Sequence, residues 1–260
     1  MSRKINIGWE KAILKVFEQN NGIVILQDLY KQVPELIGES ISLDFNHTVR
    51  AYLKRLKTSK ELIKQIGLST YALAGIKYKN HFYEEIKKNK IDDIEFINLS
   101  KDKIHGHIEG MLIEIGMFNE FDTYTPDKNI IFNGKRLEEI TTHSTIPNFT
   151  YPEILDKVRQ IDVIWFKNGF PVQTFDVENS TDFTKAFLRA YQLKSFRTKF
   201  FMVANDNKQS IYEDRKNTKP FDTIKNDVNF ISYKNIFSEY KNAVLHNKIK
   251  MQSALLKQSL

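Results

Sequence analysis

The front of the chain combines a helical hydrophobic pattern with a short strand-like run. Apolar residues recur at helical spacing from Trp9 to Phe17, and the Asn-Asn-Gly sequence after them predicts the end of that helix. The run Ile-Val-Ile-Leu at 23–26 is typical of a strand, and a second short helix follows it. We expect this second helix to end at Pro34, because proline cannot donate the helical hydrogen bond.

A third helix and a hairpin complete the front unit. The apolar stripe of the helix ends at Leu56, and either Asp44 or Ser42 could cap its start. Two β-rich runs follow, separated by Gly-Leu-Ser at 67–69, which predicts a hairpin. Helix, strand, helix, helix, hairpin is the order of a winged helix, and we assign this domain to residues 1–76.

The remainder of the chain has a different pattern. Residues 77–103 are strongly charged with few apolar positions, so we interpret them as a linker helix and its connection. We assign an α/β domain to residues 104–260. Its predicted elements are an amphipathic helix at 104–118, strands at 161–166 and 172–177, a helix at 182–194, a buried strand at 200–204 and one or two helices in 233–260. This order indicates an α/β sandwich with a mixed sheet.

Composition and charge narrow the class of protein. The chain has no cysteine, which excludes disulfides, thiolate zinc sites and cysteine nucleophiles. No apolar run is long enough to span a membrane and the N-terminus does not resemble a signal peptide, so we expect a soluble cytoplasmic protein. Lys and Arg outnumber Asp and Glu by 13 to 7 in residues 1–80, but only by 26 to 25 in the remainder. This asymmetry suggests a polyanionic partner, although an ordinary lysine-rich surface would give the same count.

Three acidic residues lie on the two strands predicted to form a hairpin. Asp162 lies inside an apolar strand, and Asp176 and Glu178 share one face of the next strand because side chains alternate. A two-residue turn at 168–169 would leave Asp162 and Asp176 on opposite faces of the hairpin. A three-residue turn that includes Phe170 would set them directly opposite each other. We expect the three-residue turn, because the proline that follows cannot donate to a regular hairpin ladder.

Converging carboxylates at the edge of an apolar sheet repel one another, and a divalent cation is the simplest compensation. Mg²⁺ favours a few carboxylates together with water and phosphate oxygens. Such an ion acidifies a water molecule and neutralises charge in the transition state. The pattern therefore predicts phosphodiester hydrolysis with Mg²⁺, for which Mn²⁺ could substitute.

The sequence from 104 to 235 resembles the PD-(D/E)XK nuclease core of type II restriction endonucleases. The resemblance rests on a His-Ile-Glu helix start at 107–109, the strand that opens with Asp162, the strand end Phe-Asp-Val-Glu-Asn-Ser-Thr at 175–181 and the Arg-containing helix behind it. Residues 1–76 are similar to the winged helix called HARE-HTH, which is often fused to such nucleases. Together the resemblances imply a winged helix followed by a restriction-endonuclease-like α/β/α core with a mixed sheet.

The resemblance also implies roles for particular acids. Asp162 and Asp176 match the metal-binding acids of the family. Glu109 matches the acid on the first core helix, and it is preferred over Glu114. Glu178 stands where the family usually has lysine; some members use Glu there, and proton transfer then depends on water or on an unassigned group. The implied catalytic residues are Asp162, Asp176, Glu178 and Glu109, and the implied Mg²⁺ ligands are Asp162, Asp176 and Glu109.

Other polar residues of this domain admit more than one role. His107 could hydrogen-bond the scissile phosphate or cap the start of its helix, and His105 is interpreted as an ordinary polar residue. Lys185 and Arg189 lie on the polar side of their helix, where they could hold DNA phosphates or simply face solvent. Residues 179–181 could reach the substrate or cap that helix.

The third helix of the front unit carries a polar and basic face suited to the DNA major groove. These side chains recur at helical spacing away from the apolar stripe. Arginine can recognise guanine and asparagine can recognise adenine through paired hydrogen bonds. The residues expected to contact DNA are Asn46, Arg50, Lys54, Arg55 and Lys57 here, with Lys185 and Arg189 in the core. The same face would suit an ordinary solvated helix, and some winged helices bind proteins instead.

These observations predict an Mg²⁺-dependent, sequence-specific endonuclease that cleaves double-stranded DNA. Cleavage of both strands usually needs paired active sites, so a homodimer is expected. No Walker-type Gly-Lys-Ser/Thr motif occurs, and no nucleotide cofactor is expected. Two alternatives remain: a transposon-end or methylation-dependent nuclease, and a DNA-binding regulator whose nuclease domain is inactive because Glu178 replaces the lysine.

Overall fold

The structure is a computed structural model of the chain, and it divides into two compact units. The described residues are 8–38, 45–77, 82–88, 90–99, 101–179 and 182–256, without the side chains of 101–102 and 247–256. The front unit is Met1–His81 and the second unit is Phe82–Leu260. This division lies between the expected domain boundaries at 76 and 104. None of the described helices is long and apolar enough to cross a membrane.

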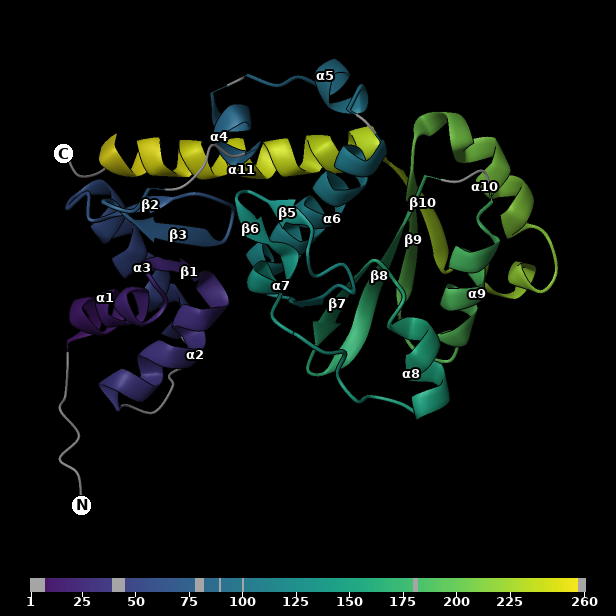
Figure 1. The fold of residues 1–260 in the computed structure, drawn as a ribbon, viewed down its shortest axis with the longest axis horizontal. Helices are drawn as coiled ribbons and strands as arrows, with labels where there is room; N and C mark the ends of the chain where they lie inside the picture. The colour runs from purple at the N-terminus through teal and green to yellow at the C-terminus, as the bar shows by residue number, and fades with distance from the viewer. Residues whose placement is uncertain are drawn as a thin grey trace. The chain divides into compact units, whose positions relative to one another are not determined.

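The described part of the front unit consists of helices and a small antiparallel sheet (Figure 1). Its elements are α1 (Trp9–Gln19), β1 (Ile23–Ile25), α2 (Leu26–Ile37), α3 (Phe45–Thr58), β2 (Ile63–Gln65) and β3 (Thr70–Leu73). The strands pair in the order β1-β3-β2. The helices bury their apolar stripes in one core, which includes Phe17, Leu29 and Leu53.

The predicted end of the second helix at Pro34 is wrong. Helix α2 continues to Ile37, because Val33 and Ile37 are buried on its core side and compensate for the hydrogen bond that proline cannot make. Gly38 then ends the helix in the left-handed conformation, and its N–H donates to the carbonyl of Pro34 at 2.9 Å. The predicted caps of α3, Asp44 and Ser42, lie outside the described residues.

The second unit is an α/β sandwich. Its helices are α4 (Phe82–Lys87), α5 (Asp93–Ile97), α6 (Lys101–Phe118), α7 (Leu137–Ile140), α8 (Pro152–Val158), α9 (Thr184–Gln192), α10 (Gln209–Lys216) and α11 (Tyr233–Leu256), with 3-10 turns η1 (Asp206–Lys208) and η2 (Phe221–Ile224). Its strands are β4 (Asp122–Tyr124), β5 (Ile131–Phe132), β6 (Lys135–Arg136), β7 (Val163–Lys167), β8 (Phe170–Glu178), β9 (Lys199–Ala204) and β10 (Val228–Ser232).

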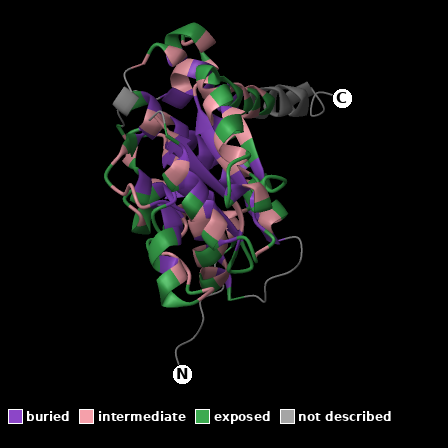
Figure 2. Ribbon diagram, turned by 90° about the vertical axis from the view of Figure 1, so that its right-hand side faces the viewer, coloured by how far each residue is buried: buried purple, intermediate pink, exposed green. Residues whose placement is uncertain are grey.

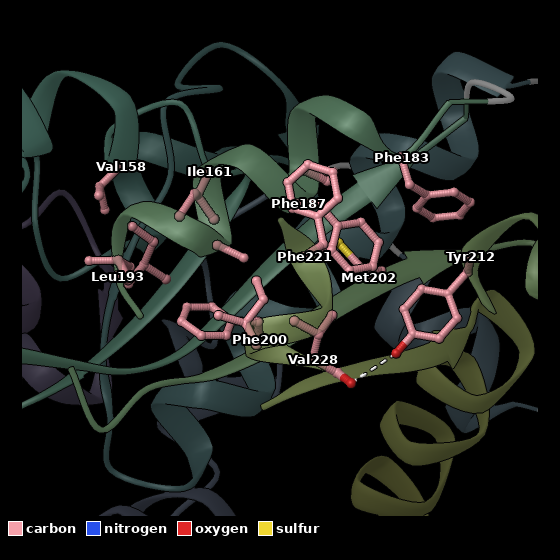
Figure 3. Close-up of a cluster of buried hydrophobic side chains, with 14 of the residues drawn as sticks. Val158, Ile161, Phe183, Phe187, Leu193, Phe200, Met202, Tyr212, Phe221 and Val228 are labelled. Carbon is pink, nitrogen blue, oxygen red and sulfur yellow. Dashed lines mark hydrogen bonds between the residues drawn. The ribbon is translucent and has the colours of Figure 1, made fainter. Parts of the chain in front are cut away.

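A mixed sheet forms the centre of this unit, which confirms the predicted fold class. Its strand order is β10-β9-β8-β7-β4, with β10, β9 and β8 parallel and β7 and β4 antiparallel to their neighbours. One face packs against α8, α9 and α10 in a core that includes Phe187, Phe200 and Met202 (Figure 3). Tyr212 of α10 joins this core and donates its hydroxyl to the carbonyl of Val228. Figure 2 shows buried residues concentrated in the interior.

The opposite face of the sheet packs against α6. Trp165 of β7 donates its indole N–H to the carbonyl of Leu112 in α6 at 3.1 Å. Residues 77–103, expected to form a linker helix, include α4 and α5, which pack against α11. Phe82 and Phe96 from these helices are buried, and Phe96 stacks on Phe237 of α11. These two helices are therefore part of the core of the second unit.

Candidate active site

Helix α6 carries two residues of the candidate site. It begins at Lys101, so the predicted helix start at His107 is wrong and His107 lies inside the helix. His105 and Glu109 are four residues apart and therefore share one face of α6. Every residue from Ile108 to Met117 is buried, so an acid in this stretch has no contact with solvent.

The two buried glutamates of α6 differ in their hydrogen bonds. Glu114 accepts from the Tyr240 hydroxyl at 2.5 Å and from the Asn133 amide at 3.3 Å. Glu109 is 0% exposed, and neither of its carboxylate oxygens has a hydrogen-bond partner among the described residues. Its Oε1 lies 3.3 Å from His105 Nε2, which is an ion-pair distance without hydrogen-bond alignment. Glu114 therefore has a structural role, whereas Glu109 is left with unused ligand atoms.

The β7–β8 hairpin places Asp162 at the end of the sheet. The predicted three-residue turn is wrong: Lys167 pairs with Phe170, and the two residues between them, at 168–169, have positive φ angles. These angles are typical of a two-residue hairpin turn. A register shift between Trp165 and Phe166 follows, and the ladder then pairs Val163 with Phe175.

That register shift brings Asp162 to the level of Asp176, although the turn has two residues. A β-bulge inserts one residue and so reverses the expected face of every side chain beyond it. Asp162 precedes the first strand pair, and its Oδ2 accepts the backbone N–H of Val177 at 2.6 Å. This bond fixes the carboxylate at the end of β8.

Four side chains with metal-ligating atoms converge at this end of the sheet: His105, Glu109, Asp127 and Asp162. One ligand atom from each lies within 4.8 Å of the others. Asp127 comes from the loop after β4, and β4 reaches Asp162 because it pairs with β7, with Tyr124 opposite Ile164. His105 Nε2 is 3.9 Å from Asp127 Oδ2. We call His105, Glu109, Asp127 and Asp162 the four-residue cluster.

Burial and mutual charge shift the pKa values of the four-residue cluster. Burial raises the pKa of Glu109 to about 8, although His105 opposes the shift. Burial also raises the pKa of Asp162. Burial disfavours the charged form of His105, but the carboxylates of Asp127 and Glu109 outweigh it and raise the pKa of His105 to about 10. The interaction with His105 lowers the pKa of Asp127. The cluster therefore favours a positive charge at its centre.

Asp176 was expected to bind the metal, and Glu178 was expected at the position of the usual lysine. In the structure both carboxylates lie next to Arg189. Asp176 is only 2% exposed, and its Oδ1 accepts the Arg189 Nε–H at 2.7 Å. Arg189 Nη2 lies 3.7 Å from Glu178 Oε1. Burial raises the pKa of Asp176, and Arg189 opposes that shift. Asp176 is not among the four residues of the cluster, although its charge and that of Asp162 influence each other.

His107 points to an aromatic cluster instead of the four-residue cluster. Its ring makes edge contacts with Phe82 and Phe132, and its Nδ1 lies 2.7 Å from the carbonyl of Lys103. Burial lowers the pKa of His107. Its position therefore gives it a packing contact within the second unit.

Residues 179–181 were expected to reach substrate or cap the next helix. Asn179 accepts the Tyr233 hydroxyl at 2.7 Å, and its Nδ2 lies 3.4 Å from His105 Nδ1. Helix α9 has Phe183 at its N-cap position without a side-chain cap. The other two residues of 179–181 lie outside the described residues. Asn179 therefore contacts the four-residue cluster through His105.

The expected DNA-contacting residues lie in both units. In the second unit, a groove between α8 and α9 is lined by Lys157, Gln160, Lys185, Leu188, Arg189 and Gln192. In the front unit, Arg50, Lys54 and Arg55 are exposed on α3, while Asn46 and Lys57 are half-buried. Arg50 donates to the Tyr30 hydroxyl at 2.7 Å, and Lys57 donates to Gln65 at 2.6 Å.

The sequence analysis did not identify His105 and Asp127 as members of the candidate site. The spacing of His105 and Glu109, one helical turn apart, was a signal that could have revealed the histidine. Asp127 had no such local signal, because it lies in a loop 35 residues before Asp162 and depends on the β4–β7 pairing.

Comparison with protein families gives a match that covers most of the second unit. A family model described as the type II restriction enzyme NmeDI C-terminal domain matches residues 84–257. No curated protein and no solved structure matches the chain. The matched range begins near the start of the second unit at Phe82 and contains the four-residue cluster.

Proposed function

Since the chain belongs to the family of the type II restriction enzyme NmeDI C-terminal domain, we propose that it is a metal-dependent endonuclease that hydrolyses double-stranded DNA. The finer proposal is a PD-(D/E)XK nuclease that cuts at a specific sequence. Its second unit would carry the chemistry and its front unit would bind DNA. Mg²⁺ is the proposed cofactor, Mn²⁺ could substitute, and no nucleotide cofactor is needed.

The fully buried carboxylate of Glu109, which has no hydrogen bond among the described residues, is the observation that carries this proposal. A fully buried carboxylate without hydrogen bonds is costly, and nearby acids increase that cost. Asp162 and Asp127 lie close enough to share a cation with it. The residues therefore fit a divalent metal. When bound, such an ion supplies positive charge for the scissile phosphate and increases the acidity of the attacking water.

The protein's own groups would hold this arrangement in place. The Val177 N–H orients Asp162, and Arg189 neutralises the buried Asp176 beside it. Glu178 stands at the position where a lysine is usual in the PD-(D/E)XK family, and Arg189 Nη2 provides a positive charge 3.7 Å from Oε1 of Glu178. We propose that Arg189 holds the phosphate charge that this lysine would otherwise face. Asp176 would then position Arg189 and remain close to the metal site.

The DNA path would follow the groove between α8 and α9. Lys157, Lys185 and Arg189 line it, and cations next to carboxylate-based chemistry suit a phosphate backbone. The front unit has the helix-strand-helix-helix-strand-strand order and antiparallel sheet of a winged helix, which supports assignment of α3 as its DNA-reading helix. Cutting both strands would use a homodimer.

A plasmid cleavage assay with Asp162→Asn tests the function. We expect the parent protein with Mg²⁺ to give discrete fragments, and the variant to bind DNA without cutting it, because the substitution removes a ligand charge and keeps the shape. Asp156→Asn is the control, since the side chain of Asp156 on α8 is 63% exposed and ion-paired with Arg159. Cleavage by Asp162→Asn at the parent rate would refute the site.

Glu178 supports one alternative. Without the usual lysine, the second unit could be an inactive nuclease domain in a DNA-binding regulator. Binding without cleavage by the parent protein, with either Mg²⁺ or Mn²⁺, would favour that function. Nicking or cleavage of modified DNA alone would favour a transposon-related or methylation-dependent nuclease.

A further inference from the structure

The four-residue cluster differs from an all-oxygen magnesium site because it contains an imidazole. His105 Nε2 points to the carboxylates, with Glu109 Oε1 at 3.3 Å and Asp127 Oδ2 at 3.9 Å. The other ring nitrogen lies 3.4 Å from the Asn179 amide, which contacts the opposite edge of the ring. Asn179 in turn accepts the hydroxyl of Tyr233. The imidazole thus has one nitrogen directed at the three acids.

The spacing of the ligand atoms is compatible with a single ion. Atoms bound about 2.1 Å from a metal lie at most about 4.2 Å from one another. The four atoms of the cluster lie within 4.8 Å, so a small movement would close the site. Glu109 is an independent indication of a ligand, because its carboxylate is fully buried and neither oxygen has a hydrogen-bond partner among the described residues.

We propose that His105 and Asp127 join Glu109 and Asp162 in a mixed nitrogen–oxygen site that prefers a first-row transition metal ion such as Mn²⁺ to Mg²⁺. Imidazole nitrogen is a good ligand for transition metals, whereas Mg²⁺ selects oxygen ligands and retains water. This inference rests on the proposed function only in treating the cluster as the metal site of the nuclease. It assigns ligand roles to two residues outside the carboxylates predicted from the sequence.

Metal titration of the full chain tests the preference. After treatment with a chelator, the protein is titrated with Mn²⁺ and with Mg²⁺ in a calorimeter. We expect tighter binding of Mn²⁺ by the parent. His105→Asn should weaken Mn²⁺ binding at least tenfold and Mg²⁺ binding much less, so the ratio of the two affinities should fall. Asp127→Asn should weaken both.

His246→Asn is the matched histidine control, because His246 is exposed on α11 and lies outside the cluster. It should leave both affinities unchanged. If the ratio of Mn²⁺ affinity to Mg²⁺ affinity were the same in His105→Asn as in the parent, the proposal would be overturned. Circular dichroism melts of each variant verify folding.

Pulsed electron paramagnetic resonance of the Mn²⁺-loaded parent protein gives an answer without any variant. Nitrogen modulation from a coordinated imidazole is expected, and its absence would refute the role of His105. The outcomes also separate this proposal from the nuclease function. Loss of Mn²⁺ preference in His105→Asn would support the mixed site even if no DNA were cut. Mg²⁺-driven cleavage with an unchanged metal preference would keep the nuclease and reject His105 as a ligand.

Discussion

The two buried glutamates of α6 form a matched pair with opposite expected effects on stability. Glu109 and Glu114 are both 0% exposed, but among the described residues only Glu114 accepts hydrogen bonds, from Tyr240 and Asn133. A buried carboxylate without hydrogen bonds has lost its hydration, and the ion pair of Glu109 with His105 offsets only part of that loss. In the metal-free protein we therefore expect Glu109→Gln to raise the free energy of unfolding and Glu114→Gln to lower it.

The raised pKa of Glu109 sets an upper limit on the gain. Burial moves this pKa from 4.5 to about 8, so the unfolded chain ionises first and the stability of the parent falls as pH rises through this range. At about 1.4 kcal/mol for each pH step, the loss at about pH 7.5 is at most about 4 kcal/mol. Glutamine keeps unpaired polar atoms that cost about 1–3 kcal/mol. The net expected gain for Glu109→Gln is therefore at most about 1–3 kcal/mol.

For Glu114→Gln, replacement of one of the two carboxylate oxygens that accept from Tyr240 and Asn133 by an NH2 group should cost about 1–3 kcal/mol. Thermal unfolding in chelator measures both effects, and each kcal/mol corresponds to about 2–4 °C in Tm for a protein of this size. Repeating the melts at about pH 5 should shrink the gain of Glu109→Gln, because the parent carboxyl then ionises less in the unfolded chain. A decrease in Tm for Glu109→Gln as large as that for Glu114→Gln would refute the reasoning.

Three further predictions concern the metal, the core and the ion pair. Mn²⁺ at a hundredfold excess over its Kd should stabilise the parent by about 2.7 kcal/mol and raise its Tm, with little effect on Asp162→Asn; equal Tm shifts would place the binding elsewhere. Gly110→Ala should cost about 1–3 kcal/mol in urea unfolding despite the helix preference of alanine, because a Cβ there would lie 2.1 Å from Cγ of Phe132; a neutral effect would show that the ring can yield. Arg189→Met should cost about 3 kcal/mol or more in the same assay because it leaves Asp176 buried without its cation, and adding Asp176→Asn should recover part of the loss; an additive double variant would contradict this pairing.

The local pattern of apolar residues was sufficient to predict those strands and helices of the second unit whose apolar residues follow a strand or helical spacing. The strands around Asp162 and Asp176 are short apolar runs, and the predicted ranges 161–166 and 172–177 overlap β7 and β8 closely. Helices α6 and α9 were also anticipated, because their apolar spacing is helical over more than two turns. The charged segment at 77–103 was interpreted as a linker, whereas its Phe82 and Phe96 pack on α11.

The turn between β7 and β8 shows where local reasoning fails. The two-residue turn at 168–169 follows from backbone angles that Asn and Gly adopt readily, whereas the register depends on the irregularity beyond it. A bulge is set by how β8 must pair with β7 on one side and β9 on the other. Asp162 and Asp176 therefore lie at the same level of the hairpin, as expected, but because of a bulge and not because of a three-residue turn.

The sequence by itself determined which acids stand in apolar surroundings, because strand alternation and helical spacing are local properties. It also limited the acid of the first core helix to Glu109 or Glu114. Only the tertiary structure shows how their surroundings differ, since the hydrogen-bond donors to Glu114 are Asn133 and Tyr240, far away in the chain. The same holds for Asp127, which reaches Asp162 through the pairing of β4 with β7. A metal site needs several ligand atoms within a few ångströms, and long-range strand pairing creates that proximity.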